Sequence, residues 1–161
     1  IFHEDGRTYL NRSQDTYDII YLDAFRSFYG VPSQLTTIEA TKNIFRILNT
    51  NGVLVANIPA ALEGAYSKFF QAELKTYQSV FPEVHAYAVS SPNNGEVVQN
   101  IILVAFKNKE TIRTSPSDDK EINEQLTHRW FGELDPTTPI LTDDFAPTDY
   151  YTSMFVDLHS F

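Results

Sequence analysis

A carboxylate lies near the end of the apolar segment YDIIYLDAF, residues 17–25. A short run of β-branched and aromatic residues is typical of a buried strand. In open α/β sheets, ligands bind beyond the carboxyl ends of the parallel strands. Asp23 occupies that end of the run, so it is a candidate site residue whose carboxylate can face a cleft while the strand behind it stays buried. The alternative is an ordinary loop or capping residue. Asp18, at the amino end of the run, is interpreted as a turn residue.

Three other polar features are candidates for chemistry. Asp5 and Gly6, taken by themselves, are interpreted as a turn into a helix that Asp5 caps. Asn57, at the end of a second apolar run, either faces the cleft or lies in a turn. Asp143 and Asp144 either bind a cation, close over a site or are solvated loop acids. The four histidines show no metal-ligand spacing, so no metal site is expected.

The composition indicates one packed globular domain. The chain has 161 residues, of which 42% are hydrophobic and 14% aromatic, enough for a sizeable core. It has no cysteine, which excludes disulfides, thiolate metal ligands and cysteine nucleophiles and is compatible with a cytoplasmic protein. No apolar run reaches the length that a bilayer requires.

The net charge of −9 is unevenly distributed. Residues 1–110 carry nine Lys/Arg and eleven Asp/Glu, whereas residues 111–161 carry three and ten. Nucleic acid is therefore disfavoured as a partner, because phosphate binding needs a basic surface. The acidic end favours a cationic partner or simply aids solubility.

The order of elements predicts an α/β domain with a parallel sheet that ends in an antiparallel hairpin. Parallel strands are expected at 18–22 and 53–58, and an antiparallel pair at 84–89 and 97–106, joined across Asn94 and Gly95. Helices are expected at 37–48, where Thr36 and Glu39 have capping-box spacing, and at 62–80. A short acidic helix is expected at 121–130, and residues 141–155 are interpreted as a loop. Residues 1–110 are predicted to form the main domain and residues 111–161 an acidic extension that packs on it.

Several segments carry a resemblance to a known family. DGRTYL, YDIIYLDAF, GVPSQLTTIEATKNIFRILNTNGVLVANI, FPEVHAYAV, NIILVAF and LTDDFAPTDYY are similar to the later part of the spermidine synthase family. These polyamine aminopropyltransferases share a Rossmann-like fold of the class I methyltransferase type. The resemblance implies a partial sheet of that fold and an aminopropyl transfer from decarboxylated S-adenosylmethionine to an amine, with the nucleoside and the amine as small-molecule partners.

The resemblance also implies site residues. Asp5 and Gly6 match the pair that contacts the adenine of decarboxylated S-adenosylmethionine, and Pro32 matches a proline that walls the adenine pocket. Asp23 matches the aspartate that helps to deprotonate the attacking amine. The family's second aspartate is replaced by Arg26, whose charge repels the ammonium of an ordinary diamine.

The family's glycine-rich loop and its ribose-binding acid have no counterpart in this sequence, which contains no Gly-x-Gly-x-x-Gly pattern. The chain is accordingly interpreted as a fragment that is expected to be inactive by itself. The alternatives are a non-catalytic remnant or interaction module of the same fold, and a methyltransferase that uses S-adenosylmethionine. A membrane partner is expected only if the parent protein is a form with fused membrane segments. The strand at 17–25 would lack its family neighbour, so we expect self-association through its edge or coverage by the terminal segment of the chain.

Overall fold

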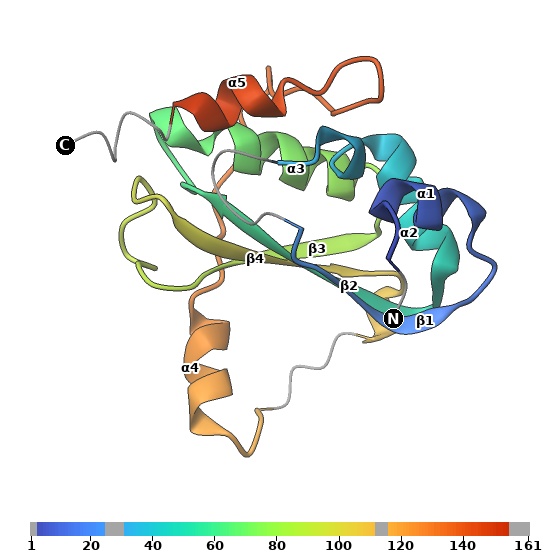
Figure 1. The fold of residues 1–161 in the computed structure, drawn as a ribbon. Helices are drawn as coiled ribbons and strands as arrows, with labels where there is room; N and C mark the ends of the chain where they lie inside the picture. Colours follow the sequence, from blue (N-terminus) through green and yellow to red (C-terminus); the bar gives the residue numbers. More distant parts are fainter. Residues whose placement is uncertain (1–2, 25–30, 112–115, 155–161) are drawn as a thin grey trace.

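A mixed four-stranded sheet forms the centre of the fold (Figure 1). The computed structural model describes residues 3–24, 31–111 and 116–154. The strands lie in the order β1-β2-β4-β3, with bounds β1 (Tyr17–Leu22), β2 (Leu48–Ala60), β3 (Glu83–Ala88) and β4 (Gln99–Phe106). β1 is parallel to β2, and β4 is antiparallel to β2 and β3. The predicted α/β class, the parallel pair and the antiparallel pair are confirmed.

Most of the helices lie on one side of the sheet (Figure 1). α1 (Gly6–Arg12), α2 (Ile38–Ile47) and α3 (Lys68–Gln78) lie on that side, with α5 (Thr148–Ser153) beyond α3. α4 (Lys120–Thr127) lies on the opposite side and contacts β3. Among the described residues, no helix is both long and apolar enough to cross a membrane.

The start of α2 differs by one residue from the expected capping box. Thr37 is the N-cap, and its hydroxyl oxygen accepts a hydrogen bond from the Ala40 N–H at 3.3 Å. The hydroxyl of Thr36 donates instead to the Ser33 carbonyl at 2.8 Å. Two adjacent threonines offer the same capping chemistry, so the sequence alone could not distinguish them.

α3 is shorter than the predicted helix at 62–80. Gly64 has a φ of 73°, in the left-handed region that interrupts a helix, and the chain enters α3 through a 3-10 turn at Ala65–Ser67. The apolar residue Leu62 belongs to the core but not to the helix.

α1 and α5 are short helices. α1 begins directly after Asp5, in agreement with the capping interpretation of Asp5, whereas α5 was not predicted and lies inside the aromatic segment at 141–155 that was interpreted as a loop. Helices of six or seven residues are too short to show a clear apolar periodicity, so their sequences give little signal.

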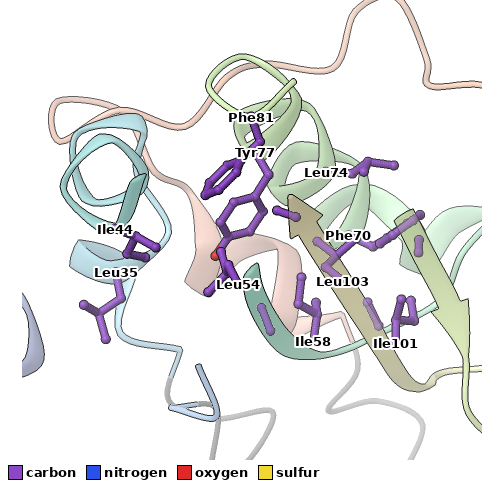
Figure 2. Packing of buried hydrophobic residues seen from close by; sticks show 14 of the residues in the cluster. Leu35, Ile44, Leu54, Ile58, Phe70, Leu74, Tyr77, Phe81, Ile101 and Leu103 are labelled. Atoms are coloured by element: carbon purple, nitrogen blue, oxygen red, sulfur yellow. The ribbon is translucent and has the colours of Figure 1, made fainter. Parts of the chain in front are cut away.

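The core lies between the sheet and the helices α1, α2 and α3 that cover one of its faces (Figure 2). Alternate residues of β2 and β4 point into it, so each strand has one buried and one partly exposed face. Tyr77 and Phe81 follow one another along the end of α3 and its continuation, with ring centroids 6.3 Å apart. Phe45 of α2 packs edge-on against Phe81 at 5.2 Å, which joins the two helices.

One carboxylic acid lies inside this core. Glu73 of α3 is fully buried, and neither of its side-chain oxygens has a hydrogen-bond partner among the described residues. Burial raises the pKa of Glu73 well above its ordinary value, because the charged form loses its hydration. The same burial, together with the neighbouring Glu73, raises the pKa of Tyr77. Burial therefore favours the protonated form of Glu73 in the folded protein more than in the unfolded chain.

Residues 141–143 of the acidic extension contact helices α3 and α1. The Leu141 N–H donates to the Thr76 hydroxyl at 2.9 Å, and Arg7 forms an ion pair with Asp143 at 2.6 Å. The division of the chain near residue 110 stays a prediction.

Candidate functional site at the carboxyl edge of the parallel strands

Asp23 and Asn57 lie side by side where β1 and β2 meet. The parallel register pairs Leu22 with Ala56, so the next residue of each segment comes to the same position. The Asn57 side-chain amide donates to Asp23 Oδ1 at 3.1 Å. The Asp23 carboxylate is exposed and, having four lone-pair sites, can accept further hydrogen bonds. Asn57 lies within β2 and not in a turn, which corrects one of the two interpretations of that residue.

The side-chain amide oxygen of Asn57, Oδ1, is a further unusual feature of this edge. It is buried and has no hydrogen-bond partner among the described residues. Buried polar atoms are generally paired, and exceptions are concentrated at strained or functional positions. The side-chain N–H of Asn57 therefore holds Asp23, while the side-chain oxygen of Asn57 has no donor among the described residues.

A second aspartate–asparagine pair marks the opposite end of β1. Asn49 donates to Asp18 Oδ1 at 2.7 Å, and both side chains lie at the amino end of the parallel pair. Asp18 is thus a strand residue and not a turn residue. Because ligands bind at the carboxyl ends of parallel strands, only the Asp23 pair has the position of a functional site.

Asp5 caps α1. Its Oδ1 accepts from the Thr8 N–H at 2.9 Å. That backbone hydrogen bond lowers the pKa of Asp5, and side-chain hydrogen bonds from Thr8 and Gln34 lower it further. The capping interpretation of Asp5 is therefore observed, and the carboxylate keeps lone pairs for another donor.

Gly6 and Pro32 lie in the same neighbourhood as Asp5. A Cβ at Gly6 would lie 3.5 Å from a methyl group of Leu35, which is an ordinary contact. Pro32 precedes the 3-10 turn Ser33–Leu35, and its carbonyl accepts from the Leu35 N–H at 2.8 Å. The structure therefore brings the start of α1 and the Pro32 turn together.

An apolar groove of about 490 Å³ begins at Gly6 and Leu35 and follows β1. Its other walls are apolar and aromatic side chains of α1, β1 and α2: Tyr9, Leu10, Tyr17, Ile19, Ile20, Leu22, Ile44 and Ile47. Ligand sites are concave and mostly apolar, as this groove is, but neither Asp5 nor Pro32 is among its lining residues.

The remaining sequence candidates have other roles or no described position. Asp143 accepts from Arg7 and from the Thr37 hydroxyl, so it joins the 141–145 turn to α1 and α2. Asp144 is exposed. Within the described residues, no hydrogen bond or ion pair links the Asp23–Asn57 pair to Asp5 or Gly6. Arg26 lies outside the described residues, and no group of three or more His, Asp or Glu side chains in the described part could hold a metal.

A parallel strand pair extended by an antiparallel hairpin, with its polar pair at the carboxyl edge, defines a Rossmann-like α/β domain. The chain belongs to the family described as the spermine/spermidine synthase domain, whose model matches residues 1–115.

Individual relatives agree with this family. The chain is 31% identical to the polyamine aminopropyltransferase of Vibrio vulnificus, over 90% of this chain and 50% of that protein. It is also 31% identical to a probable polyamine aminopropyl transferase of Bifidobacterium longum, over 90% of this chain and 36% of that protein. The chain therefore spans half the length or less of these relatives.

A solved structure shows the same fold. The probable spermidine synthase from Corynebacterium glutamicum matches with a TM-score of 0.59 and 23% identity, over 78% of this chain and 42% of that chain.

Proposed function

We propose that this chain supplies the amine-activating part of an aminopropyl-transfer site. The observation that carries the proposal is the exposed Asp23 carboxylate, held by Asn57 at the carboxyl end of β1. Membership of the spermine/spermidine synthase domain family supports this reaction class. The donor would be decarboxylated S-adenosylmethionine and the acceptor an amine.

The chemistry requires a group at this position. The amine nitrogen forms a bond to the propyl carbon next to the sulfonium sulfur, the carbon–sulfur bond breaks, and its electron pair stays on sulfur in methylthioadenosine. The nitrogen is nucleophilic only after it loses a proton, and Asp23 accepts that proton. Asn57 is a positioning residue, because it holds the carboxylate while leaving its other lone pairs available for the ammonium group.

The nucleoside would occupy the end of the groove at Gly6 and Leu35. By the family resemblance, the adenine would pass Gly6 without meeting a side chain, donate its exocyclic amine hydrogen to Asp5 and lie against Pro32. The chain contains no Gly-x-Gly-x-x-Gly pattern to bind the rest of the nucleoside. Each missing charge-assisted hydrogen bond is worth about 1.5–3 kcal/mol, so we expect the 161-residue chain to bind methylthioadenosine weakly.

Titration of the 161-residue chain with methylthioadenosine, monitored through its backbone amide NMR signals, tests the proposed position of the nucleoside. We expect small, non-saturating shifts that are centred on Gly6 and Leu35. We expect Gly6→Ala to remove these shifts without unfolding the chain, because the added Cβ meets Leu35 only at ordinary contact distance and fills the space left for the adenine.

Asn11→Ala, on the exposed surface of the same helix, is the matched control and is expected to leave the shifts unchanged. Tight saturable binding would show that the missing loop is not needed. If the shifts occurred at residues other than Gly6 and Leu35, the proposed adenine site would be wrong. The proposed role of Asp23 would not be affected, because it is tested separately.

A further inference from the structure

Arg7, in the first turn of α1, connects that helix to other segments of the chain. One terminal nitrogen of its guanidinium, Nη1, donates to the Gln34 carbonyl at 2.9 Å and to the Thr37 hydroxyl at 2.9 Å. The other, Nη2, forms the ion pair with Asp143 at 2.6 Å, and the Arg7 side chain is only 15% exposed. The bond from Nε to Asn11 at 3.1 Å stays within α1. A single side chain therefore fixes these segments relative to one another.

The position of Arg7 is unfavourable by local criteria. The N-terminal end of a helix macrodipole is positive, so acidic residues are favoured there and basic residues are favoured near the C-terminus. The first turn of α1 contains Arg7 and no acidic residue. Asp143 offsets the charge of Arg7 and lies at the start of α2, where its carboxylate accepts from Thr37 at 2.7 Å. Local preferences are broken mainly at functional sites, so the placement of Arg7 indicates a role beyond the stability of α1.

The turn that carries Asp143 is itself firmly held. Leu141, two residues earlier, is fully buried, and its carbonyl accepts from the Ile38 N–H at 2.8 Å. The Asp143 N–H donates to Glu39 Oε2 at 3.0 Å. Asp143 therefore has a fixed position at the start of α2, from which its carboxylate positions Arg7.

Gln34 connects Arg7 with the proposed nucleoside site. Its backbone carbonyl accepts from Arg7, and its side chain donates a hydrogen bond to the Asp5 carboxylate. The next residue, Leu35, lines the apolar groove together with Gly6. A displacement of Gln34 therefore moves Leu35 and changes which lone pairs of Asp5 are free to accept from a ligand.

We propose that Asp143 is a positioning residue for the nucleoside: through Arg7, it holds Gln34 and the start of α1 in the arrangement that the adenine requires. The inference rests on the proposed function, which places the adenine beside Asp5 and Gly6. Asp143 acts through Arg7 and needs no contact with the nucleoside. The acidic extension then belongs to the nucleoside site and does more than aid solubility.

Backbone amide NMR of the ligand-free 161-residue chain tests the connection between these segments. Asp143→Asn keeps the size of the side chain but turns one accepting oxygen into an NH₂ group and removes the charge. We expect it to shift the amides of Gln34, Leu35 and Gly6, which are remote from it in the sequence. The matched control Asp144→Asn makes the same change at the neighbouring exposed residue and is expected to leave these amides unchanged.

Steady-state kinetics distinguish positioning from a merely structural role. The protein carries this sequence together with a glycine-rich nucleoside-binding loop, and the donor is decarboxylated S-adenosylmethionine. In Asp143→Asn we expect KM for the donor to rise by about fivefold or more, with kcat and KM for the amine within about twofold of the unmodified protein. A destabilised fold would instead lower the apparent kcat and leave KM unchanged, because fewer molecules are active.

Two results would overturn the proposal. One is an unchanged KM for the donor in Asp143→Asn, and the other is an equal rise in Asp144→Asn, since the loss of any negative charge would then explain the effect. Arg7→Lys is expected to reproduce the rise, because an ammonium group lacks the planar set of donors that Arg7 uses.

Calorimetric titration of the same protein with methylthioadenosine separates this inference from the proposed function. If the unmodified protein binds methylthioadenosine, Asp143→Asn weakens that binding by about fivefold or more and no transfer occurs, the positioning role stands and the proposed function is wrong. If the unmodified protein does not bind methylthioadenosine, both are wrong.

Discussion

Replacing Asp23 with Asn is expected to lower aminopropyl transfer by about 10²–10⁴-fold in a transfer-competent protein that carries this sequence. The amide has the shape of the carboxylate and its oxygen still accepts the hydrogen bond from Asn57, so the fold is expected to be unchanged. An amide cannot take the proton of the attacking amine at neutral pH. Steady-state kinetics should therefore show a loss in kcat that is larger than any rise in KM for the amine.

The structure offers a matched control for this substitution. Asp18→Asn changes the other aspartate of the same strand, which is exposed and also accepts from an asparagine. Because Asp18 lies at the amino end of β1, transfer is expected to stay within about twofold of the unmodified protein, as for surface changes away from a site. Equal losses in both variants would mean that β1 as a whole, and not the Asp23 carboxylate, supports the reaction.

The stability of the domain is expected to fall as the pH rises, because of Glu73. Burial raises the pKa of Glu73, so the folded protein keeps a proton that the unfolded chain releases from about pH 4.5 upward. Ionisation then favours the unfolded state until the pH passes the raised pKa. Relative to Glu73→Gln, the unmodified chain should lose up to about 1.4 kcal/mol of unfolding free energy per pH unit in this range.

Urea unfolding of the unmodified chain and of Glu73→Gln, measured at several values between about pH 5 and pH 8, checks this expectation. The difference between the two proteins isolates Glu73, since all other titrating groups are shared. Glu121→Gln, on the exposed surface of α4, is the control and should show no such slope. A flat difference for Glu73→Gln would show that Glu73 gains a partner or is ionised in the folded protein.

The sheet was predictable from the sequence because each strand has a strong local signal. The segments at 17–22 and 53–58 are β-branched runs bounded by turn residues, and Asn94-Gly95 indicated the antiparallel pair. The exact start of α2 depends on one capping bond, at Thr37, and α5, which has no side-chain cap, depends on tertiary packing; neither leaves a clear trace in composition.

The candidate site was only half predictable. Asp23 could be selected because a carboxylate follows an apolar run, but its partner Asn57 depends on the register between β1 and β2. Asp23 and Asn57 are more than thirty residues apart in the sequence, and the register that pairs their strands leaves no local sequence pattern. Each of the two residues does lie at the end of an apolar run. Glu73 was missed because one acid within an amphipathic helix is ordinarily solvated, and its burial depends on how α3 packs.

The identity of the nucleoside product tests the central claim most directly. A protein that carries this sequence together with a glycine-rich nucleoside-binding loop is incubated with an amine and either decarboxylated S-adenosylmethionine or S-adenosylmethionine, and the products are identified by mass spectrometry. We predict methylthioadenosine and an aminopropylated amine in equal amounts from the decarboxylated donor, and a strong loss of both in Asp23→Asn. Formation of S-adenosylhomocysteine from S-adenosylmethionine would instead identify a methyltransferase, and the absence of any product from either donor would contradict a catalytic role for this site.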